Sequence, residues 1–464
     1  MPGAVDGSVG FVAAVRAKYE HKKGSEEGGE LVGGDQTGQK QALSTLARVF
    51  LPDSRISSAG EDGEISTTCG AIEELDLGGN EGLDGWASLQ SIAAQLPKLH
   101  WFGIDRIKLT PLTALPEGFR VAFGGLRTLC ASGTGMQWDQ LLFLASAMPK
   151  LEELHMSSNG IATLETAKGA EAGGAASVLG CVRELYLESN CLTSWSCLAP
   201  LASLPSLTLL NVNHNQLGAI PHNGTAGFGA LRHLMLRANP IDAWASIDAL
   251  DSFPSLTEAR LAELPLTKSM SGAAARRTII ARVARLKALN GSEVRTRERE
   301  DAERFYLRQV ASEYPEGGLP EGAMVQVEPP ADISDAPTKD EYGRDIGPAT
   351  GASGGGGRME LRLPETEEWE ALRARHPRWA ELLVHHGTHV TRNAGGGHSG
   401  GVIANELVEV TLRPISAETA HLPACVRKLP GGLPLKSIKL IACQLFKVRG
   451  AHTNLIKALI KAYY

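Results

Sequence analysis

The segment Leu151-Glu-Glu-Leu154-His-Met156-Ser-Ser-Asn159-Gly-Ile161 has a spacing of apolar residues and asparagine that recurs through the middle of this chain. The alternating side chains of Leu154 and Met156 predict a short strand with one buried face. The amide of Asn159 can hydrogen-bond to backbone groups that are left unpaired where the strand turns. One such unit cannot bury its apolar face alone, so the pattern predicts a stack of similar units.

Copies of this L-x-x-L-x-L-x-x-N pattern begin at Ile72, Leu99, Leu126, Leu151, Val182, Leu207, Leu231 and Leu256. Successive starts are separated by 27, 27, 25, 31, 25, 24 and 25 residues. All but one separation fall within the roughly 20–29 residues of a leucine-rich repeat. We therefore predict an α/β leucine-rich-repeat solenoid of about eight repeats, with parallel strands on its concave face and helices on its convex face. The long separation contains a Gly/Ala-rich stretch at 169–177, which we expect to be a surface loop.

The repeats are expected to occupy residues 64–290 and to be capped at both ends, because a solenoid needs polar-faced terminal units for solubility. Residues 1–63 are predicted to hold a short amphipathic helix at 10–19, a flexible Gly/Glu-rich stretch, and an apolar segment at 42–51 that begins the N-terminal cap.

At the other end, residues 276–290 are predicted to form a helix followed by a strand-like end, and residues 291–314 a charged cap helix over 295–312. Residues 315–361 are rich in Pro, Gly and acidic side chains and lack apolar periodicity, so we expect a disordered linker.

Residues 362–404 are predicted to form one helix over 369–385 and then a Gly/His-rich loop. Residues 405–464 are predicted to be a partial ubiquitin-like β-grasp segment, because strands at 405–413 and 424–429 precede a helix at 435–448. We expect the chain to end before the further strands that such a domain needs to cover its sheet.

Composition and charge point to a protein that interacts with other proteins in a reducing compartment. The formal net charge is −6, so nothing global attracts nucleic acid or an acidic membrane surface. The seven cysteines are odd in number and scattered, and they are expected to be mostly reduced core thiols. The N-terminus does not resemble a secretory signal, and no window approaches the ~20 apolar residues of a membrane span. We expect a soluble, cytoplasmic protein.

Residues that could carry catalysis or hold a cofactor are not apparent in the sequence. No phosphate-binding glycine loop, nucleophile elbow or zincin pattern occurs. Four histidines at 385, 386, 389 and 398 form the only metal-like cluster, but no Cys, Asp or Glu accompanies them at zinc spacing. We therefore expect no metal, no cofactor and no enzyme activity.

The side chains that flank the buried leucines of each strand are the candidate binding surface. We single out Trp101, Glu153, His155, Glu184, Tyr186, Glu188, Asn211, Asn213, Arg237 and Arg260, from a wider row that adds Glu74, Asp76, Asp105, Thr128 and His233. This row is acidic over its first half and is expected to turn basic near its end. Trp101 and Tyr186 are aromatic anchors of the kind that dominate interface energies. The alternative interpretation is a merely solvated face.

Short segments along most of the chain resemble, in the same order, one known family. They are Phe11–Tyr19, Leu151–Leu154, Glu184–Asn190, Leu286–Asn290 with Glu298–Arg304, His376–Trp379 and Lys428–Gly431. Together they resemble tubulin-specific chaperone E, also called tubulin-folding cofactor E. The resemblance implies a cytoskeleton-associated protein that binds α-tubulin and acts with other tubulin-folding cofactors in assembling and dismantling the αβ-tubulin heterodimer. The family's N-terminal CAP-Gly module is expected to be absent, because this chain begins where that module would end.

Two other functions remain open from the residues alone. A generic leucine-rich-repeat scaffold subunit of a ribonucleoprotein or an axonemal assembly would have the same capped repeats and would not bind free tubulin. The acidic strand face argues against RNA, which usually requires a basic surface. An adaptor that reaches the proteasome would need a complete ubiquitin-like domain.

Overall fold

Each repeat contributes a strand of three residues whose middle side chain is buried, as the alternation of apolar residues requires. The computed structural model describes residues 9–20, 43–83, 85–165, 174–222, 227–327 and 358–387, and the strands at 407–414, 425–430 and 456–460. The chain divides into two units, Met1–Gly395 and Gly396–Tyr464.

The eight predicted repeats supply eight parallel strands of one sheet. They are β4 (Glu74–Asp76), β5 (Trp101–Gly103), β6 (Thr128–Cys130), β7 (Glu153–His155), β8 (Glu184–Tyr186), β9 (Leu209–Asn211), β10 (His233–Met235) and β11 (Glu258–Arg260). Each strand pairs with the next in the same register, so that equivalent residues of successive repeats stand opposite each other. The predicted α/β leucine-rich-repeat fold is confirmed.

The sheet extends beyond the predicted repeats at both ends. Before β4, β2 (Arg48–Phe50) adds a parallel strand. After β11, β12 (Ala288–Leu289) adds another parallel strand and β13 (Ser292–Glu293) an antiparallel one, which gives eleven strands in all. The cap segments extend the sheet because they bury their apolar residues, such as Val49 and Leu289, in line with the repeat leucines.

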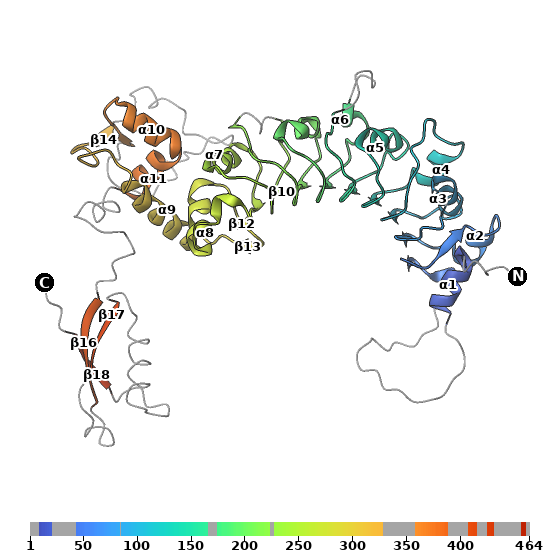
Figure 1. The fold of residues 1–464 in the computed structure, drawn as a ribbon, viewed down its shortest axis with the longest axis horizontal. Coiled ribbons are helices and arrows are strands. Elements are labelled where there is room, and N and C mark those ends of the chain that lie inside the picture. The colour runs from blue at the N-terminus through green and yellow to red at the C-terminus, as the bar shows by residue number, and fades with distance from the viewer. Residues whose placement is uncertain are drawn as a thin grey trace, which may run out of the picture. The chain divides into compact units, whose positions relative to one another are not determined.

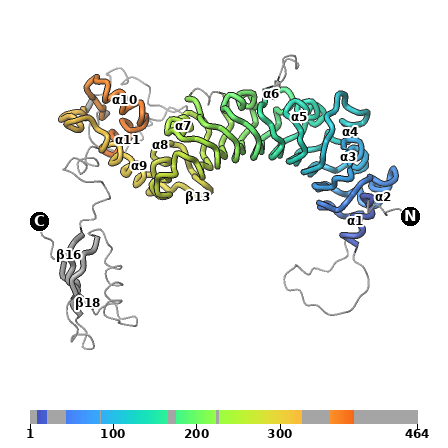
Figure 2. Tube along the Cα trace, viewed as in Figure 1, coloured from blue at the N-terminus to red at the C-terminus, as the bar shows by residue number. Residues whose placement is uncertain are grey.

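Helical segments lie along one face of this sheet and leave the other, here called the strand face, uncovered (Figures 1 and 2). They are α2 (Glu64–Cys69), α3 (Gly85–Ala93), α4 (Phe119–Phe123), α5 (Trp138–Ala145), α6 (Gly174–Val178), η2 (Trp195–Ser203), α7 (Trp244–Ala249), η4 (Leu250–Ser252) and η5 (Pro265–Thr267). The expected surface loop at 169–177 is in part α6, and residues 166–173 lie outside the described residues.

The first or second residue of the helical segment in every other repeat is a tryptophan. Trp86, Trp138, Trp195 and Trp244 follow β4, β6, β8 and β10. Two of them pack against phenylalanine rings of the next repeat: the ring centroids of Trp86 and Phe119 are 5.6 Å apart, and those of Trp195 and Phe228 are 6.2 Å apart. Paired repeats therefore share one aromatic core element.

The repeat asparagines form a buried ladder. Asn190 is 5% exposed, and its amide nitrogen donates to the carbonyls of Met156 and Leu187 at 3.0 and 2.9 Å. Its amide oxygen accepts from the backbone nitrogens of Asn159 and Ile161, both at 3.0 Å. One side chain thus satisfies four backbone groups in two repeats, as the sequence pattern predicts.

The N-terminal helix covers the free edge of the sheet. Helix α1 (Phe11–Tyr19) is present as expected, and β1 (Val9–Gly10) pairs with β3 (Ile56–Ser58); the 3-10 turn η1 is Leu43–Thr45. The Tyr19 hydroxyl accepts from the backbone nitrogen of Phe50 at 2.9 Å. This contact occupies a hydrogen-bonding group on an edge strand that would otherwise be open to another chain.

The expected cap helices are α8 (Gly272–Arg282) and α9 (Thr296–Ala311). The single helix predicted at 369–385 is wrong: α10 (Glu367–Arg375) and α11 (Trp379–His386) are separate, because Pro377 disfavours the helical conformation at His376, whose ψ is 68°. The two helices pack on α8 and α9 in a second core that contains Tyr306, Trp369 and Trp379.

The segment 315–361 was expected to be a disordered linker, but a strand forms near each of its ends. Strand β14 (Met324–Val327) pairs antiparallel with β15 (Arg358–Leu361). The two strands carry Met324, Val325, Val327, Met359 and Leu361, a short apolar content that the Pro, Gly and acidic composition of the whole segment conceals. Residues 328–357 lie outside the described residues.

A buried polar network joins His376 to the cap helices. Arg282 is 3% exposed and donates to both carboxylate oxygens of Asp248, at 2.8 and 2.7 Å, and to Nδ1 of His376 at 3.0 Å. The Tyr306 hydroxyl lies 2.9 Å from the same Nδ1. A nitrogen that faces the Arg282 donor is an acceptor, so the His376 proton sits on Nε2, which lies 3.2 Å from Glu313. Burial lowers the pKa of this neutral imidazole.

The second unit contains a three-stranded antiparallel sheet of order β17-β16-β18. Strands β16 (Leu407–Pro414) and β17 (Cys425–Pro430) lie where two strands were predicted. The expectation that no further strand follows is wrong, because β18 (Ile456–Ile460) pairs with β16. The predicted helix at 435–448 lies outside the described residues, and the ubiquitin-like assignment stays a prediction.

The cysteines differ in part from the expected core thiols. Cys69 and Cys130 are buried, whereas Cys181 and Cys191 are exposed and Cys197 is intermediate. The exposed pair lies outside the leucine positions of the repeat, in segments that turn between buried residues. Burial raises the pKa of Cys69 to about 11.

Replacing Asn190 with alanine tests the asparagine ladder. The Asn190→Ala variant leaves four backbone groups of two repeats without their partner. We expect the free energy of unfolding in urea to fall by about 3 kcal/mol. Asn290 is the matched control: it is exposed and accepts one hydrogen bond, from Leu261 at 2.7 Å. Its φ of 53° suits glycine, so Asn290→Gly should cost only about 1 kcal/mol. Equal losses in the two variants would contradict the ladder.

Acidification should weaken the packing of α10 on the repeat cap. The pKa of His376 is below 6.5 in the folded chain, so below pH 6.5 protons bind preferentially to the unfolded chain. Stability from this group is fully present above pH 6.5 and is lost as pH falls toward the lowered pKa, with a slope of at most about 1.4 kcal/mol per pH unit. Urea unfolding at pH 7.5 and 5.5 should show a smaller pH dependence in His376→Gln than in the natural chain. An unchanged pH dependence would refute the assignment.

Candidate binding surface on the strand face

A stacked pair of rings stands at the centre of the strand face. His155 ends β7 and Tyr186 ends β8, and the parallel register places the two residues opposite each other. Their ring centroids are 4.2 Å apart with an angle of 5° between the planes. The pair is a flat aromatic platform that the in-register pairing of β7 with β8 creates.

Carboxylates flank this platform on both strands. Glu153 Oε1 lies 2.8 Å from His155 Nε2, and the Tyr186 hydroxyl donates to Glu184 Oε2 at 2.7 Å. Burial and then the bond to Glu184 raise the pKa of Tyr186 above its ordinary value, so the phenol stays protonated and keeps donating. We call Glu153, His155, Glu184 and Tyr186 the acidic-aromatic cluster. The side chains of Glu153 and His155 are 35% and 29% exposed, so the cluster is accessible and yet held in place.

More acidic side chains surround the cluster. Asp76 and Asp105 bond backbone nitrogens of Gly78 and Ser132, at 2.8 and 2.6 Å. Glu188 lies 3.9 Å from His214. Among the described residues, no Lys or Arg forms an ion pair with Asp76, Asp105, Glu153, Glu184 or Glu188. Together with burial, the charges of Asp105, Glu153 and Asp76 raise the pKa of Cys130, which is consistent with a negative environment.

The row was predicted to turn basic near its end, but its arginines add no net positive charge there. Arg237 bonds Glu263, and Arg260 lies 4.0 Å from Glu258, which also lies 3.1 Å from His233. Arg237 and Arg260 are half-exposed, but neighbouring glutamates neutralise them. The sequence row omitted Glu258 and Glu263, and the repeat register would have placed both beside the arginines.

Asn211 and Asn213 were predicted to face solvent, but both side chains are buried. They are 6% and 8% exposed. The amide of Asn211 donates to Glu188 at 3.1 Å, and the oxygen of Asn213 accepts from the backbone nitrogen of Arg237 at 2.8 Å. These short amide side chains hydrogen-bond to the neighbouring repeat, so they hold Glu188 and the backbone of Arg237 in place. Thr128, at 8%, is buried as well.

Trp101 lies apart from the acidic-aromatic cluster and packs edge-on against Phe50, with ring centroids 6.1 Å apart. Phe50 is 39% exposed and was missed because it belongs to the cap strand β2, one strand before the first repeat copy. The structure therefore brings Glu153, His155, Glu184 and Tyr186 together and leaves Trp101 with Phe50 as a second aromatic site.

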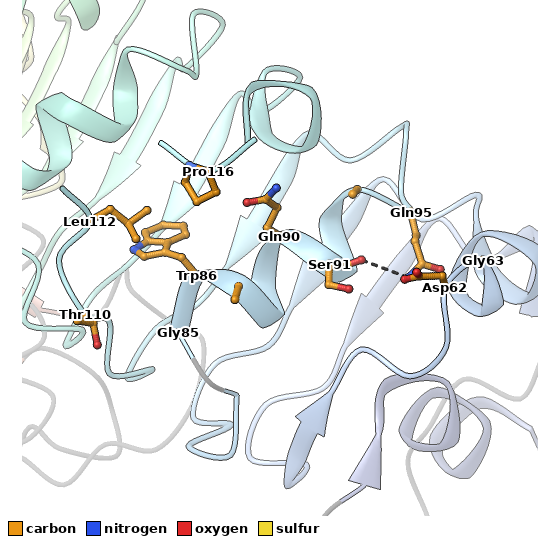
Figure 3. Close-up of a pocket in the computed structure, with 12 residues that line it drawn as sticks. Asp62, Gly63, Gly85, Trp86, Gln90, Ser91, Gln95, Thr110, Leu112 and Pro116 are labelled. Carbon is orange, nitrogen blue, oxygen red and sulfur yellow. Dashed lines mark hydrogen bonds between the residues drawn. The ribbon is translucent and has the colours of Figure 1, made fainter. Parts of the chain in front are cut away.

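A groove of about 740 Å³ runs along α3 on the helix layer. Figure 3 shows Trp86, Leu112 and Pro116 at one end and Asp62 and Gln95 at the other. Its lining has one acidic side chain and no paired catalytic groups. Across the described residues, no group of three or more His, Cys, Asp or Glu could hold a metal ion, and no helix is long and apolar enough to cross a membrane. His389 and His398, of the histidine cluster, lie outside the described residues.

No protein-family model matches this chain. A tubulin-folding cofactor E from Arabidopsis thaliana is 27% identical over 92% of this chain and 71% of its own length. Tubulin-specific chaperone E from Homo sapiens is 30% identical over 68% of this chain and 62% of its own length. A human tubulin-specific chaperone cofactor E-like protein is 30% identical over 58% of this chain and 62% of its own length. The resemblance predicted from the sequence is confirmed.

The chain spans less than two thirds of the two human relatives. Among solved structures, a leucine-rich-repeat protein of Leptospira interrogans covers 56% of this chain and 59% of its own, with 19% identity and a TM-score of 0.36. The fold assignment follows from the strand pairing and not from this likeness.

Proposed function

We propose that this chain, a relative of the tubulin-specific chaperone E proteins, is a tubulin-folding cofactor that binds α-tubulin with its strand face. The acidic-aromatic cluster is the observation that carries the proposal for the site. It combines carboxylates that lack an Arg or Lys partner among the described residues with an accessible stacked platform. Such a surface suits a partner patch that presents basic and apolar groups, since complementary charge selects the partner and aromatic contacts supply affinity.

Binding, rather than catalysis, is the activity that this arrangement supports. Charge complementarity would speed association and fix the register of the partner, whereas the rigid repeat stack would limit the entropy lost on binding. We further propose that the chain acts with other tubulin-folding cofactors on the αβ-tubulin heterodimer, and that it works in the cytoplasm near the cytoskeleton. The names of its relatives, tubulin-folding cofactor E and tubulin-specific chaperone E, support a role in tubulin folding.

Co-elution with purified αβ-tubulin on a sizing column tests the function. We expect the full chain to shift into a shared peak with tubulin at micromolar concentrations. Separate elution of the two proteins at these concentrations would overturn the tubulin-binding proposal.

Charge reversal at Glu184 and Glu188 tests the site. The Glu184→Lys/Glu188→Lys variant removes the hydrogen bond to Tyr186 and replaces two carboxylates beside the platform with ammonium groups. We expect its affinity for tubulin to fall by at least about tenfold, as like charges replace complementary ones. The matched control, Glu117→Lys/Glu165→Lys, changes the same charge at exposed loop residues outside the sheet and should bind normally. Equal binding by both variants in a pull-down would move the site elsewhere.

A further inference from the structure

The residues that directly precede the strands form a second line of side chains along one rim of the strand face. Backbone hydrogen bonds run from Thr208 to Arg183, Arg232 to Thr208, Thr257 to Arg232 and Lys287 to Thr257, at 2.7–2.9 Å. These five residues are thus in register from β8 to β12, and three of them are cationic. We call Arg183, Arg232 and Lys287 the cation row.

The cation row is exposed and is not neutralised. Further along the same line, Arg127 Nη1 lies 2.6 Å from Glu152 Oε1, which shows that side chains at neighbouring positions of the line can reach each other. Arg183, Arg232 and Lys287 are separated by threonines instead. Within the described ranges, none of the three forms an ion pair, in contrast to Arg237 and Arg260 on the strands. Three cations, one at every second strand from β8 to β12, are therefore available to a ligand.

The spacing of the cation row narrows the class of ligand. Neighbouring strands lie about 4.8 Å apart, so cations on every second strand stand about 9.6 Å apart. A polyproline-II chain advances about 9.3 Å in three residues and places every third side chain on one side. Successive phosphates of a nucleic-acid strand are only about 3.4 Å apart along the axis, so their spacing does not match that of the row.

A groove at the end of the row provides space for such a chain. It has a volume of about 450 Å³ and is lined by Thr257, Arg285, Lys287, Thr296 and Arg299 among others. Arg285 is exposed and Arg299 is partly buried, so the groove continues the positive charge of Lys287. The guanidinium of Arg299 is held by carbonyls of Ile280 and Val283, at 2.9 and 3.2 Å.

We propose that the cation row binds an extended acidic segment of a partner protein, with a carboxylate at every third residue seated on Arg183, Arg232 and Lys287. This site goes beyond the proposed function, because it uses residues outside the acidic-aromatic cluster and takes a ligand of the opposite charge. It would let one repeat stack hold a basic patch and an extended acidic segment of its partners at the same time.

A peptide-binding measurement tests the proposal without tubulin. The probe is a fluorescein-labelled (Glu-Pro-Pro)5 peptide, titrated with the full chain and followed by fluorescence anisotropy at several salt concentrations. We expect saturable binding that weakens as salt rises. A peptide with five consecutive glutamates followed by ten prolines has the same composition without the spacing, and it should bind several-fold more weakly.

Variants locate the site. Arg183→Gln/Arg232→Gln/Lys287→Gln should lose about tenfold in affinity, because each exposed ionic contact contributes roughly two- to threefold. Arg127→Gln is the matched control, since this arginine stands in the same line but already pairs with Glu152. Circular dichroism should be unchanged in all variants, because the three row residues and Arg127 are exposed.

Three results would overturn the proposal. They are unchanged affinity in the triple variant, an equal loss in Arg127→Gln, and binding of an oligouridine of 15 nucleotides as tightly as the spaced peptide. Equal binding of the two glutamate peptides would refute the spacing argument. Failure of the chain to co-elute with tubulin bears only on the proposed function, because this assay contains no tubulin.

Discussion

In-register parallel pairing of short strands is the constraint on which the rest of the first unit depends. Each repeat strand is only three residues long, so register cannot slip by one without exposing a buried leucine such as Leu154 or Leu185. The buried asparagine ladder fixes the same register a second time, through backbone groups of adjacent repeats. Side chains at equivalent positions must therefore form straight lines, and this is why the stacked rings, the carboxylates and the cation row exist as surfaces at all.

The polar network at His376 extends this rigidity past the repeats. Arg282 belongs to α8 and Asp248 to α7, while His376 follows α10, so one buried guanidinium connects three helical segments. Arg378 adds contacts to the carbonyl of Ala281 and to Glu303. Removing one partner of such a network leaves a buried charge uncompensated, which is far more costly than the pair is stabilising. The network thus specifies how α10 and α11 pack more than it adds net stability.

The sequence predicts the repeats well because leucine and asparagine spacing encodes local geometry. It predicts which strands form and which residues of each strand are buried, and these determine the register. It fails where tertiary partners decide: Asn211 and Asn213 are polar and sit at outward positions, yet neighbours cover them. The neutralisation of Arg237 by Glu263 depends on residues of two repeats, and the pairing of β14 with β15 joins segments that are about 30 residues apart in the chain. The break between α10 and α11 could have been predicted from the sequence, because Pro377 disfavours a helical conformation at His376.

Two features of the chain share a period of two repeats. Trp138, Trp195 and Trp244 open helical segments after β6, β8 and β10, and Arg127, Arg183 and Arg232 directly precede the same strands. The rim residue of the intervening repeats is Glu152 before β7 and Thr208 before β9, and the core of the β9 repeat has the smaller ring of Phe228. A bulky core residue on one side of a repeat and a long cation on the other thus recur together. The repeat pair is therefore the structural unit that sets the spacing of the surface, and a ligand that contacts the rim meets a cation at every second strand from β6 to β10.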